Sequence, residues 1–245
     1  MVVSFIVTSY NYSEYIEQTI ESIKSQSYKD FEIIVVDDFS TDNSVEILEK
    51  IKGIKLVKHL SNNGQLAAII SGLKVATGEF VSIIDSDDVL NVDYASTMLE
   101  NLESNDVSFV NCNCKKKELI SPLEYPFGGW WWSPMSCTMF RKKYLDCVFA
   151  YDDVKNWKIC PDKFLFNIAY LQNSSLNIED TLVYKREHER NFGKVKNRKF
   201  LNVKNNLIIR NEALKIINDK SLRKVIKKSY FYLLKQVFEK LVKLC

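Results

Sequence analysis

The chain has 245 residues, 46% of them hydrophobic and 27% charged, with a formal net charge of +3. This length supports one sizeable hydrophobic core and leaves little room for two independent domains. No apolar run approaches the ~20 residues that cross a bilayer, and no basic stretch followed by a long apolar segment marks a secretory signal, so neither a membrane-spanning helix nor export is expected. The six cysteines include no Cys-x-x-Cys pair, which favours reduced thiols over a zinc site.

Strands and helices are predicted to alternate as far as about residue 110. Nearly continuous apolar runs at 2–8, 31–36 and 80–84 are typical of strands buried on both faces of a parallel sheet, and 55–60 is a weaker strand. Apolar residues at helical spacing separate these strands. The alternation predicts an α/β fold with a doubly wound, mostly parallel sheet, in which ligands bind beyond the carboxyl ends of the strands.

Local signals mark where the intervening helices begin and end. Asn11 with Glu14, and Asn43 with Glu46, have the capping-box spacing that is typical of a helix N-terminus. Gly78 follows the third helical pattern, and we expect it to end that helix.

Beyond residue 110 the pattern is irregular. Residues 121–135 contain three of the chain's four prolines, a Gly-Gly pair and three consecutive tryptophans, which is typical of a loop or an edge strand. Helices are predicted over 160–171 and, with an amphipathic pattern, over 221–245. Residues 1–184 carry 16 Lys/Arg and 26 Asp/Glu, a net −10, whereas 185–245 carry 18 and 5, a net +13. This asymmetry indicates an anionic partner for the tail, either a membrane or a nucleic acid.

Three carboxylates follow the apolar run at 80–84 directly. Asp85, Asp87 and Asp88 repel one another at a strand end unless a cation neutralises them, and carboxylate oxygens suit Mg²⁺ or Mn²⁺. Without further context, an Asp-x-Asp pattern is also compatible with a solvated turn in which an aspartate caps a helix and no metal is bound. A second alternative is a phosphatase of the haloacid-dehalogenase type, whose first Asp is a nucleophile. In those enzymes the motif normally lies on the first strand of the core, whereas here three strand–helix units precede it.

Several motifs, spaced in one order, resemble the inverting family-two glycosyltransferases, whose fold is the A-type nucleotide-sugar fold. They are TSYN at 8–11, SQSYKDFE at 25–32, VVDDFSTD at 35–42, NNG at 62–64, ATGEF at 76–80 and DSDD at 85–88. The resemblance covers roughly residues 2–115. It implies an enzyme that transfers a sugar from a nucleotide-diphosphate sugar, a UDP-sugar by default, to a hydroxyl of a glycan or lipid-linked acceptor, with inversion, in the synthesis of cell-envelope polysaccharide or lipooligosaccharide.

The resemblance also implies a division of the chain. A catalytic domain is expected over 1–200, with a nucleotide-sugar-binding half at 1–110 and an acceptor-binding half at 111–200. A basic amphipathic helical tail follows at 201–245. The expected location is the cytoplasm, on the inner face of the cell membrane, where the tail either contacts the anionic surface or packs on protein, including a second subunit in a homo-oligomer. No nucleic-acid partner is expected.

Roles at the nucleobase follow from the same resemblance. Thr8 and Tyr10 are expected to flank the base, with the Tyr10 ring as a stacking face. Asp38 is expected to accept a hydrogen bond from a base N–H, although an Asp here also serves as a loop cap. Asn63 and Gly64 are expected to line the donor pocket.

The resemblance assigns the acidic residues and a later basic segment to the diphosphate. Asp87 is expected to ligate Mn²⁺ or Mg²⁺, Asp85 to contact the ribose or the metal shell, and Asp88 is an alternative ligand. A Tyr-Lys-Arg-Glu-His segment resembles the family's Tyr-Arg-x-x-His, shifted by one at the basic residue. Arg186 or His188 is then expected at the diphosphate, with His188 as a metal ligand or, alternatively, an ordinary surface histidine.

An inverting transfer also needs a base that takes the proton of the acceptor hydroxyl. Asp162, after Pro161 at the start of a predicted helix, matches the family's position for this base, although the family often has Glu-Asp or Gly-Asp there. Asp152 and Asp153 are alternative candidates for the base. Alternatively, the Asp162 carboxylate only interacts favourably with the dipole at the N-terminus of the predicted helix. The Gly-Trp run at 129–132 is either an acceptor platform or core packing. A non-catalytic sugar-nucleotide-binding protein is the third class that the sequence leaves open.

Overall fold

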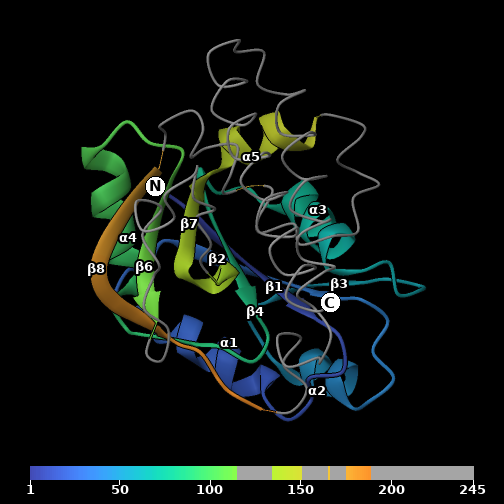
Figure 1. The fold of residues 1–245 in the computed structure, drawn as a ribbon. Coiled ribbons are helices and arrows are strands. Elements are labelled where there is room, and N and C mark those ends of the chain that lie inside the picture. Colours follow the sequence, from blue (N-terminus) through green and yellow to red (C-terminus); the bar gives the residue numbers. More distant parts are fainter. Residues whose placement is uncertain (115–133, 151–164, 166–174, 189–245) are drawn as a thin grey trace, which may run out of the picture.

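The computed structural model describes residues 1–114, 134–150, 165 and 175–188 (Figure 1). The elements are β1 (Val3–Ser9), α1 (Ile16–Lys24), β2 (Phe31–Asp37), α2 (Ser44–Lys50), β3 (Lys55–Lys58), α3 (Gln65–Val75), β4 (Phe80–Asp85), β5 (Val89–Leu90), α4 (Tyr94–Ser104), β6 (Phe109–Cys114), the short 3₁₀ helix η2 (Met135–Cys137), β7 (Thr138–Arg141), α5 (Lys142–Phe149) and β8 (Ser175–Tyr184).

These strands form one sheet of eight strands in the order β3-β2-β1-β4-β7-β6-β8-β5. The first four positions are parallel throughout, because β1 pairs in parallel with both β2 and β4, and β2 pairs in parallel with β3. Strand β7 is antiparallel to β4 and β6, β5 is antiparallel to β8, and β6 and β8 are parallel. The predicted α/β fold with a doubly wound sheet is therefore confirmed, with its antiparallel pairs in the half of the sheet beyond β4.

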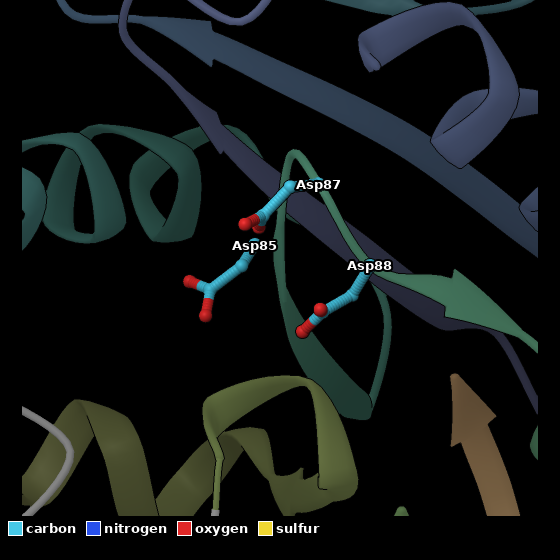
Figure 2. Close-up of side chains that lie close together, drawn as sticks. All are labelled: Asp85, Asp87 and Asp88. Carbon is cyan, nitrogen blue, oxygen red and sulfur yellow. The ribbon is translucent and has the colours of Figure 1, made fainter. Parts of the chain in front are cut away.

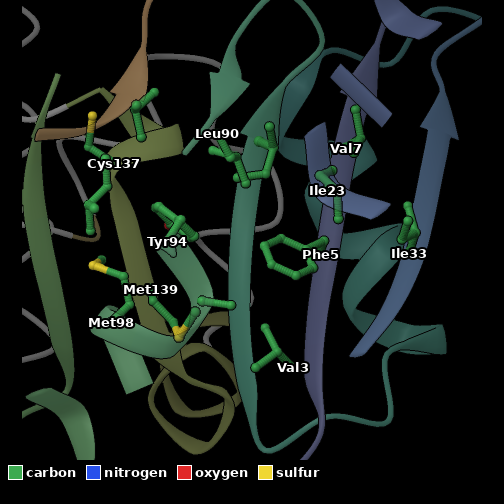
Figure 3. Packing of buried hydrophobic residues seen from close by; sticks show 14 of the residues in the cluster. Val3, Phe5, Val7, Ile23, Ile33, Leu90, Tyr94, Met98, Cys137 and Met139 are labelled. Carbon is green, nitrogen blue, oxygen red and sulfur yellow. The ribbon is translucent and has the colours of Figure 1, made fainter. Parts of the chain in front are cut away.

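Helices cover both faces of this sheet (Figure 1). Alternate residues of β1 point to opposite faces, so Phe5 packs with α1, α2 and α4, whereas Ile6 packs with α3 and α5. On the first face, Phe5 and Tyr94 lie among the side chains of β4, α4 and η2 (Figure 3). This double burial explains why the strand sequences are continuous apolar runs.

Two of the predicted helix ends are wrong, for identifiable reasons. Helix α1 begins at Ile16 with no side-chain cap, because the Asn11 side chain bonds the neighbouring loop instead. Helix α3 ends at Val75, before Gly78. Gly78 lies so close to β1 that a Cβ would come within 2.7 Å of the Val2 carbonyl oxygen, so this position needs glycine for space. Asn43 does precede α2, although its side chain makes no capping bond.

An ionic cluster centred on the partly buried Glu32 lies at the edge of the sheet opposite to the predicted ligand edge. Glu32 on β2 accepts hydrogen bonds from the Ser4 hydroxyl at 2.7 Å, the Thr77 amide at 2.6 Å and the Lys55 ammonium at 2.6 Å. Burial by itself raises the pKa of Glu32, but the bonds from Lys55, Ser4 and Thr77 outweigh burial and lower it to about 2. The cluster ties the 76–78 turn to β1 and β2.

Several predicted features lie outside the described residues. They are the tryptophan run at 130–132, the carboxylates at 152, 153 and 162, and the basic tail at 201–245. Within the ranges that the structure describes, no helix has both the length and the apolar character needed to cross a membrane.

Candidate active site

The predicted ligand residues meet at the carboxyl edge of the parallel strands. Thr8 on β1 is in register with Asp85 on β4, and Ser9 is in register with Asp37 on β2. The loops that leave β1, β2 and β4 therefore start side by side. Tyr10, just beyond β1, keeps 43% of its surface exposed.

The loops after β1 and β2 are bonded to each other. The Asp38 amide donates to the Ser9 carbonyl at 2.8 Å, and the Asn11 amide donates to the Ser40 hydroxyl at 2.9 Å. The Asn11 side chain accepts from the Thr41 amide at 2.7 Å. These bonds connect residues about thirty positions apart in sequence, and they replace the helix cap that the local spacing of Asn11 predicts.

Two residues in these paired loops have backbone angles that bulky residues rarely adopt. Asn11 has φ of 61° and Phe39 has φ of 69°. Asparagine tolerates the left-handed region, whereas for a phenylalanine it is a strained conformation. Phe39 nevertheless leaves 48% of its surface exposed, so core packing does not explain the conformation.

Asp38 is buried and its carboxylate organises the loop before α3. The Asn63 amide donates to Oδ1 at 2.9 Å, the Gly64 amide donates to Oδ2 at 2.7 Å, and His59 Nδ1 lies 2.7 Å from Oδ1. His59 Nε2 in turn lies 2.9 Å from the Ser71 hydroxyl on α3. Gly64 has φ of 87°, which favours glycine. The structure thus joins the predicted pocket residues, through backbone bonds that sequence spacing does not reveal.

The acidic cluster after β4 comprises Asp85, Asp87 and Asp88 (Figure 2). Each of these carboxylates offers one oxygen, and the three oxygens lie within 4.8 Å of one another. The Gln65 side chain donates to Asp85 Oδ1 at 2.9 Å, and the Asp85 amide donates to the Ser136 hydroxyl at 3.0 Å. Helix α3 and η2 therefore hold the cluster from its two sides.

Asp88 is the most deeply buried member of the cluster. Among the described residues, neither of its carboxylate oxygens has a hydrogen-bond partner. Burial, together with the charges of Asp85 and Asp87, raises the pKa of Asp88 to about 7, although the Lys185 ammonium and the nearby Ser136 hydroxyl act in the opposite direction. A carboxylate in this position is stabilised when a cation supplies the missing positive charge.

The segment after β8 brings basic and aromatic groups to the same cluster. Lys185 Nζ lies 3.8 Å from Asp85 Oδ2 and 3.7 Å from Asp88 Oδ2. Arg186 Nε donates to the Asp87 carbonyl at 3.0 Å, and His188 Nε2 lies 2.9 Å from Asp87 Oδ2. The predicted residues Arg186 and His188 are therefore both at the acidic cluster, about 100 positions away from it in the chain.

Sequence reasoning missed the aromatic contacts that hold this segment. The Tyr15 ring stacks on the His188 ring with centroids 5.0 Å apart, and the Arg186 guanidinium lies 4.9 Å from the Tyr15 ring centre. Tyr12 meets the His188 ring edge to face at 5.8 Å. Burial, followed by the charge of Asp87, raises the pKa of Tyr12 to about 12, so its hydroxyl stays protonated. Tyr12 and Tyr15 come directly after the TSYN motif at 8–11, but no local spacing links them to His188.

The donor set fits a divalent cation. The three carboxylates, when ionised, outnumber the two fixed cations beside them, Lys185 and Arg186, and the two Asp88 oxygens have no hydrogen-bond partner among the described residues. Oxygen ligands of this kind suit Mg²⁺ and Mn²⁺, and a histidine nitrogen beside them is compatible with Mn²⁺.

The comparisons with known proteins assign the chain to a family. The model of the glycosyl transferase family 2 matches residues 4–152, so the chain belongs to this family. An uncharacterised glycosyltransferase of Nostoc sp. is 29% identical over 78% of this chain and 66% of its own length. The UDP-Glc:alpha-D-GlcNAc-diphosphoundecaprenol beta-1,3-glucosyltransferase WfaP of Escherichia coli is 35% identical over 52% of this chain and 54% of its own length.

Solved structures share the fold. TarS of S. aureus in complex with UDP-GlcNAc has a TM-score of 0.68 with 24% identity, over 87% of this chain and 67% of that chain. A mannosyltransferase from Pyrobaculum calidifontis in complex with GDP-Man and Mn²⁺ also has a TM-score of 0.68, with 19% identity, over 87% of this chain and 64% of that chain. At these identities the likeness concerns the fold alone. The chain spans less than two thirds of the length of the curated relatives named above.

Proposed function

We propose that the chain is a metal-dependent glycosyltransferase that moves a sugar from a nucleoside-diphosphate donor to an acceptor hydroxyl. The observation that carries the proposal is Asp88, whose two buried oxygens have no donor among the described residues and lie in a three-carboxylate cluster. Family membership adds the reaction class. The haloacid-dehalogenase alternative gains nothing from the comparisons.

The donor base is proposed to lie over the paired loops after β1 and β2. Thr8 and the exposed ring of Tyr10 would flank it, and Asn63 and Gly64 would line the pocket. Asp38 has one donor at Oδ2 and two at Oδ1, so Oδ2 retains acceptor capacity for a base N–H. A UDP-sugar is the proposed donor, since TarS is crystallised with UDP-GlcNAc and WfaP is named for UDP-Glc.

The diphosphate end is proposed to lie at the acidic cluster. Asp87, Asp88 and His188 would hold Mn²⁺ or Mg²⁺, and Asp85 would contact the ribose or the metal shell. The cation, when bound, supplies positive charge to the departing diphosphate. Arg186 is held by the Asp87 carbonyl and by Gln18, and its guanidinium would reach a diphosphate that enters beside it.

The acceptor side is proposed to supply Asp162 as the general base, in an in-line displacement that inverts the anomeric carbon. Removal of a general base typically lowers the rate by about 10²–10⁴. Asp162→Asn should therefore lose transfer and keep donor affinity. Near-normal transfer by this variant, with an inactive Asp152→Asn or Asp153→Asn, would assign the general base to the inactivated position instead. A product that retains the anomeric configuration would reject the inverting mechanism.

The direct test measures nucleoside diphosphate release and sugar transfer with purified full-length protein. UDP-sugars and GDP-sugars are compared, each with Mn²⁺, with Mg²⁺ and with EDTA. Release of UDP that EDTA abolishes and Mn²⁺ restores supports the proposal. Phosphate release from simple phosphoesters would favour the phosphatase, and binding of UDP-sugar without turnover on any glycan or lipid-linked acceptor would favour a non-catalytic binder.

The tail at 201–245 is proposed to hold the enzyme at the inner face of the cell membrane, with homo-oligomerisation as the competing role. A variant that lacks 221–245 is compared with the full chain in sedimentation with anionic vesicles. Loss of vesicle binding with a retained oligomeric state supports membrane contact. Loss of the oligomer with unchanged vesicle binding supports the competing role.

A further inference from the structure

Lys185 occupies an unusual place for a lysine side chain. It is 20% exposed and lies between two carboxylates of the acidic cluster, 3.8 Å from Asp85 and 3.7 Å from Asp88. Both distances exceed a normal hydrogen bond, so the ammonium is retained by charge and not by directed bonding. Burial by itself lowers the pKa of Lys185, but Asp85, Asp88 and Asp87 together raise it, so the side chain carries its positive charge.

The backbone around Lys185 is fixed on both sides. Tyr184 pairs with Val89 in the antiparallel ladder of β8 and β5. Arg186 and His188 are bound to Asp87 and packed on the Tyr15 ring. The main chain therefore keeps the lysine at the cluster, and only its four-carbon side chain is free to change the position of the charge.

The charges around Lys185 indicate how its ammonium group affects cation binding. Lys185 is the cation nearest to Asp88, whose oxygens have no hydrogen-bond partner among the described residues, whereas the Arg186 guanidinium is bound to the Asp87 carbonyl. A divalent cation held by Asp88, together with Asp87 and His188, would lie close to the present ammonium position, because Lys185 Nζ is 3.7 Å from Asp88 Oδ2. The two positive charges repel in this buried setting, so the ion binds well only when the ammonium withdraws.

We propose that Lys185 is a resident counter-ion of the acidic cluster that competes with the divalent cation and thereby sets its affinity. The inference rests on the proposed metal site. It gives Lys185 a role that is distinct from those of Asp87, Asp88 and His188, which would hold the ion. Without metal, the lysine keeps the buried carboxylates compensated.

The test is a titration of the full chain with Mn²⁺ in the absence of nucleotide, in which free Mn²⁺ is followed by electron paramagnetic resonance. Lys185→Met keeps the length of the side chain and removes the charge, and we expect its dissociation constant for Mn²⁺ to fall by about tenfold or more. Lys185→Arg keeps the charge and should bind Mn²⁺ as the parent does. Lys58→Met, at a surface pair with Glu49, is the control for loss of a lysine and should change nothing.

The outcomes separate this inference from the proposed function. Equal or weaker Mn²⁺ binding by a folded Lys185→Met, while the parent binds Mn²⁺, overturns the counter-ion role and leaves the metal site intact. No Mn²⁺ binding by either protein overturns both. Lys185→Gln is measured alongside, so that a folding failure of the methionine variant, seen by circular dichroism, does not decide the result. Tighter binding by the glutamine variant supports the proposal, and equal or weaker binding refutes it.

Discussion

Two pairs of adjacent aspartates follow buried strands in this chain, and their surroundings differ. Asp37 and Asp38 follow β2, and backbone amides donate to both carboxylates. Asp87 and Asp88 follow β4, where His188 and Lys185 approach them, and the Asp88 oxygens have no hydrogen-bond partner in the described part of the chain. The same Asp-Asp sequence therefore has a different role in each place. A carboxylate that accepts from backbone amides stabilises its own loop, whereas one that faces mainly charges is available to a cation.

The largest effect that would test this contrast is on turnover. Asp87→Ala removes a proposed metal ligand and the partner of His188, and we expect transfer to fall by roughly 10²–10³, the size of effect seen when one group that stabilises the transition-state charge is removed. UDP release measured in saturating Mn²⁺ checks the value. Asp93→Ala, outside the cluster and exposed, is the control. Full activity of Asp87→Ala would break the contrast.

In the absence of metal, substitutions in the two aspartate pairs should change the free energy of unfolding in different directions. Asp38→Ala leaves the Asn63 and Gly64 amides without their acceptor, and a loss of about 3 kcal/mol in the free energy of unfolding is expected. Asp88→Asn removes a buried charge that has no hydrogen-bond donor among the described residues, so the metal-free protein should be as stable as the parent or more stable. Urea unfolding in EDTA at pH 8 measures both. Equal destabilisation by both variants would contradict the assignment.

Glu32 extends the contrast to the opposite edge of the sheet, where a saturated carboxylate has its pKa lowered to about 2. Because the pKa of Glu32 is lower in the folded protein than in the unfolded chain, the ionised carboxylate contributes to the free energy of unfolding. This contribution is fully present above the unfolded-state pKa, near 4.5, and is lost as the pH falls towards 2. Glu32→Gln should lower stability by about 2 kcal/mol at pH 7, where charged hydrogen bonds are lost. The difference from the parent should shrink below pH 4.5. A constant difference from pH 7 to pH 3 would refute the linkage.

The smallest expected effect concerns the strained residue beside Asp38. Phe39 holds φ of 69°, which is costly for a phenylalanine. Phe39→Gly should therefore raise the free energy of unfolding by about 1 kcal/mol, less the entropy that glycine adds to the unfolded chain. Thermal unfolding measures the change, with Val92→Gly, exposed but outside these loops, as the control for flexibility. A loss of stability equal to the control's would show that the Phe39 ring contributes packing.

The sequence reveals those parts of the fold that depend on local pattern. Apolar runs identify β1, β2 and β4, and the aspartates at their ends identify the ligand edge. The motif around Arg186 and His188 is also readable, and both residues do lie at the acidic cluster. In each case the signal consists of residues that are close in sequence.

The features that sequence reasoning missed depend on contacts between distant segments. Asn11 has the spacing of a helix cap, yet it bonds a loop thirty residues away, because the pairing of β1 with β2 makes the loops after these strands start side by side. The place of Lys185 depends on the pairing of β8 with β5 and β6, which no local periodicity encodes. The roles predicted for residues 152, 153 and 162 remain predictions.

The late position of β8 has a consequence for how the molecule is made on the ribosome. The carboxylates of the acidic cluster are synthesised about 100 residues before the lysine, arginine and histidine that approach them. At translation rates of about 5–20 residues per second, the nascent sheet exposes an uncompensated acidic edge for roughly 5–20 s. During that interval only cations from the surrounding solution can compensate the charge of this edge.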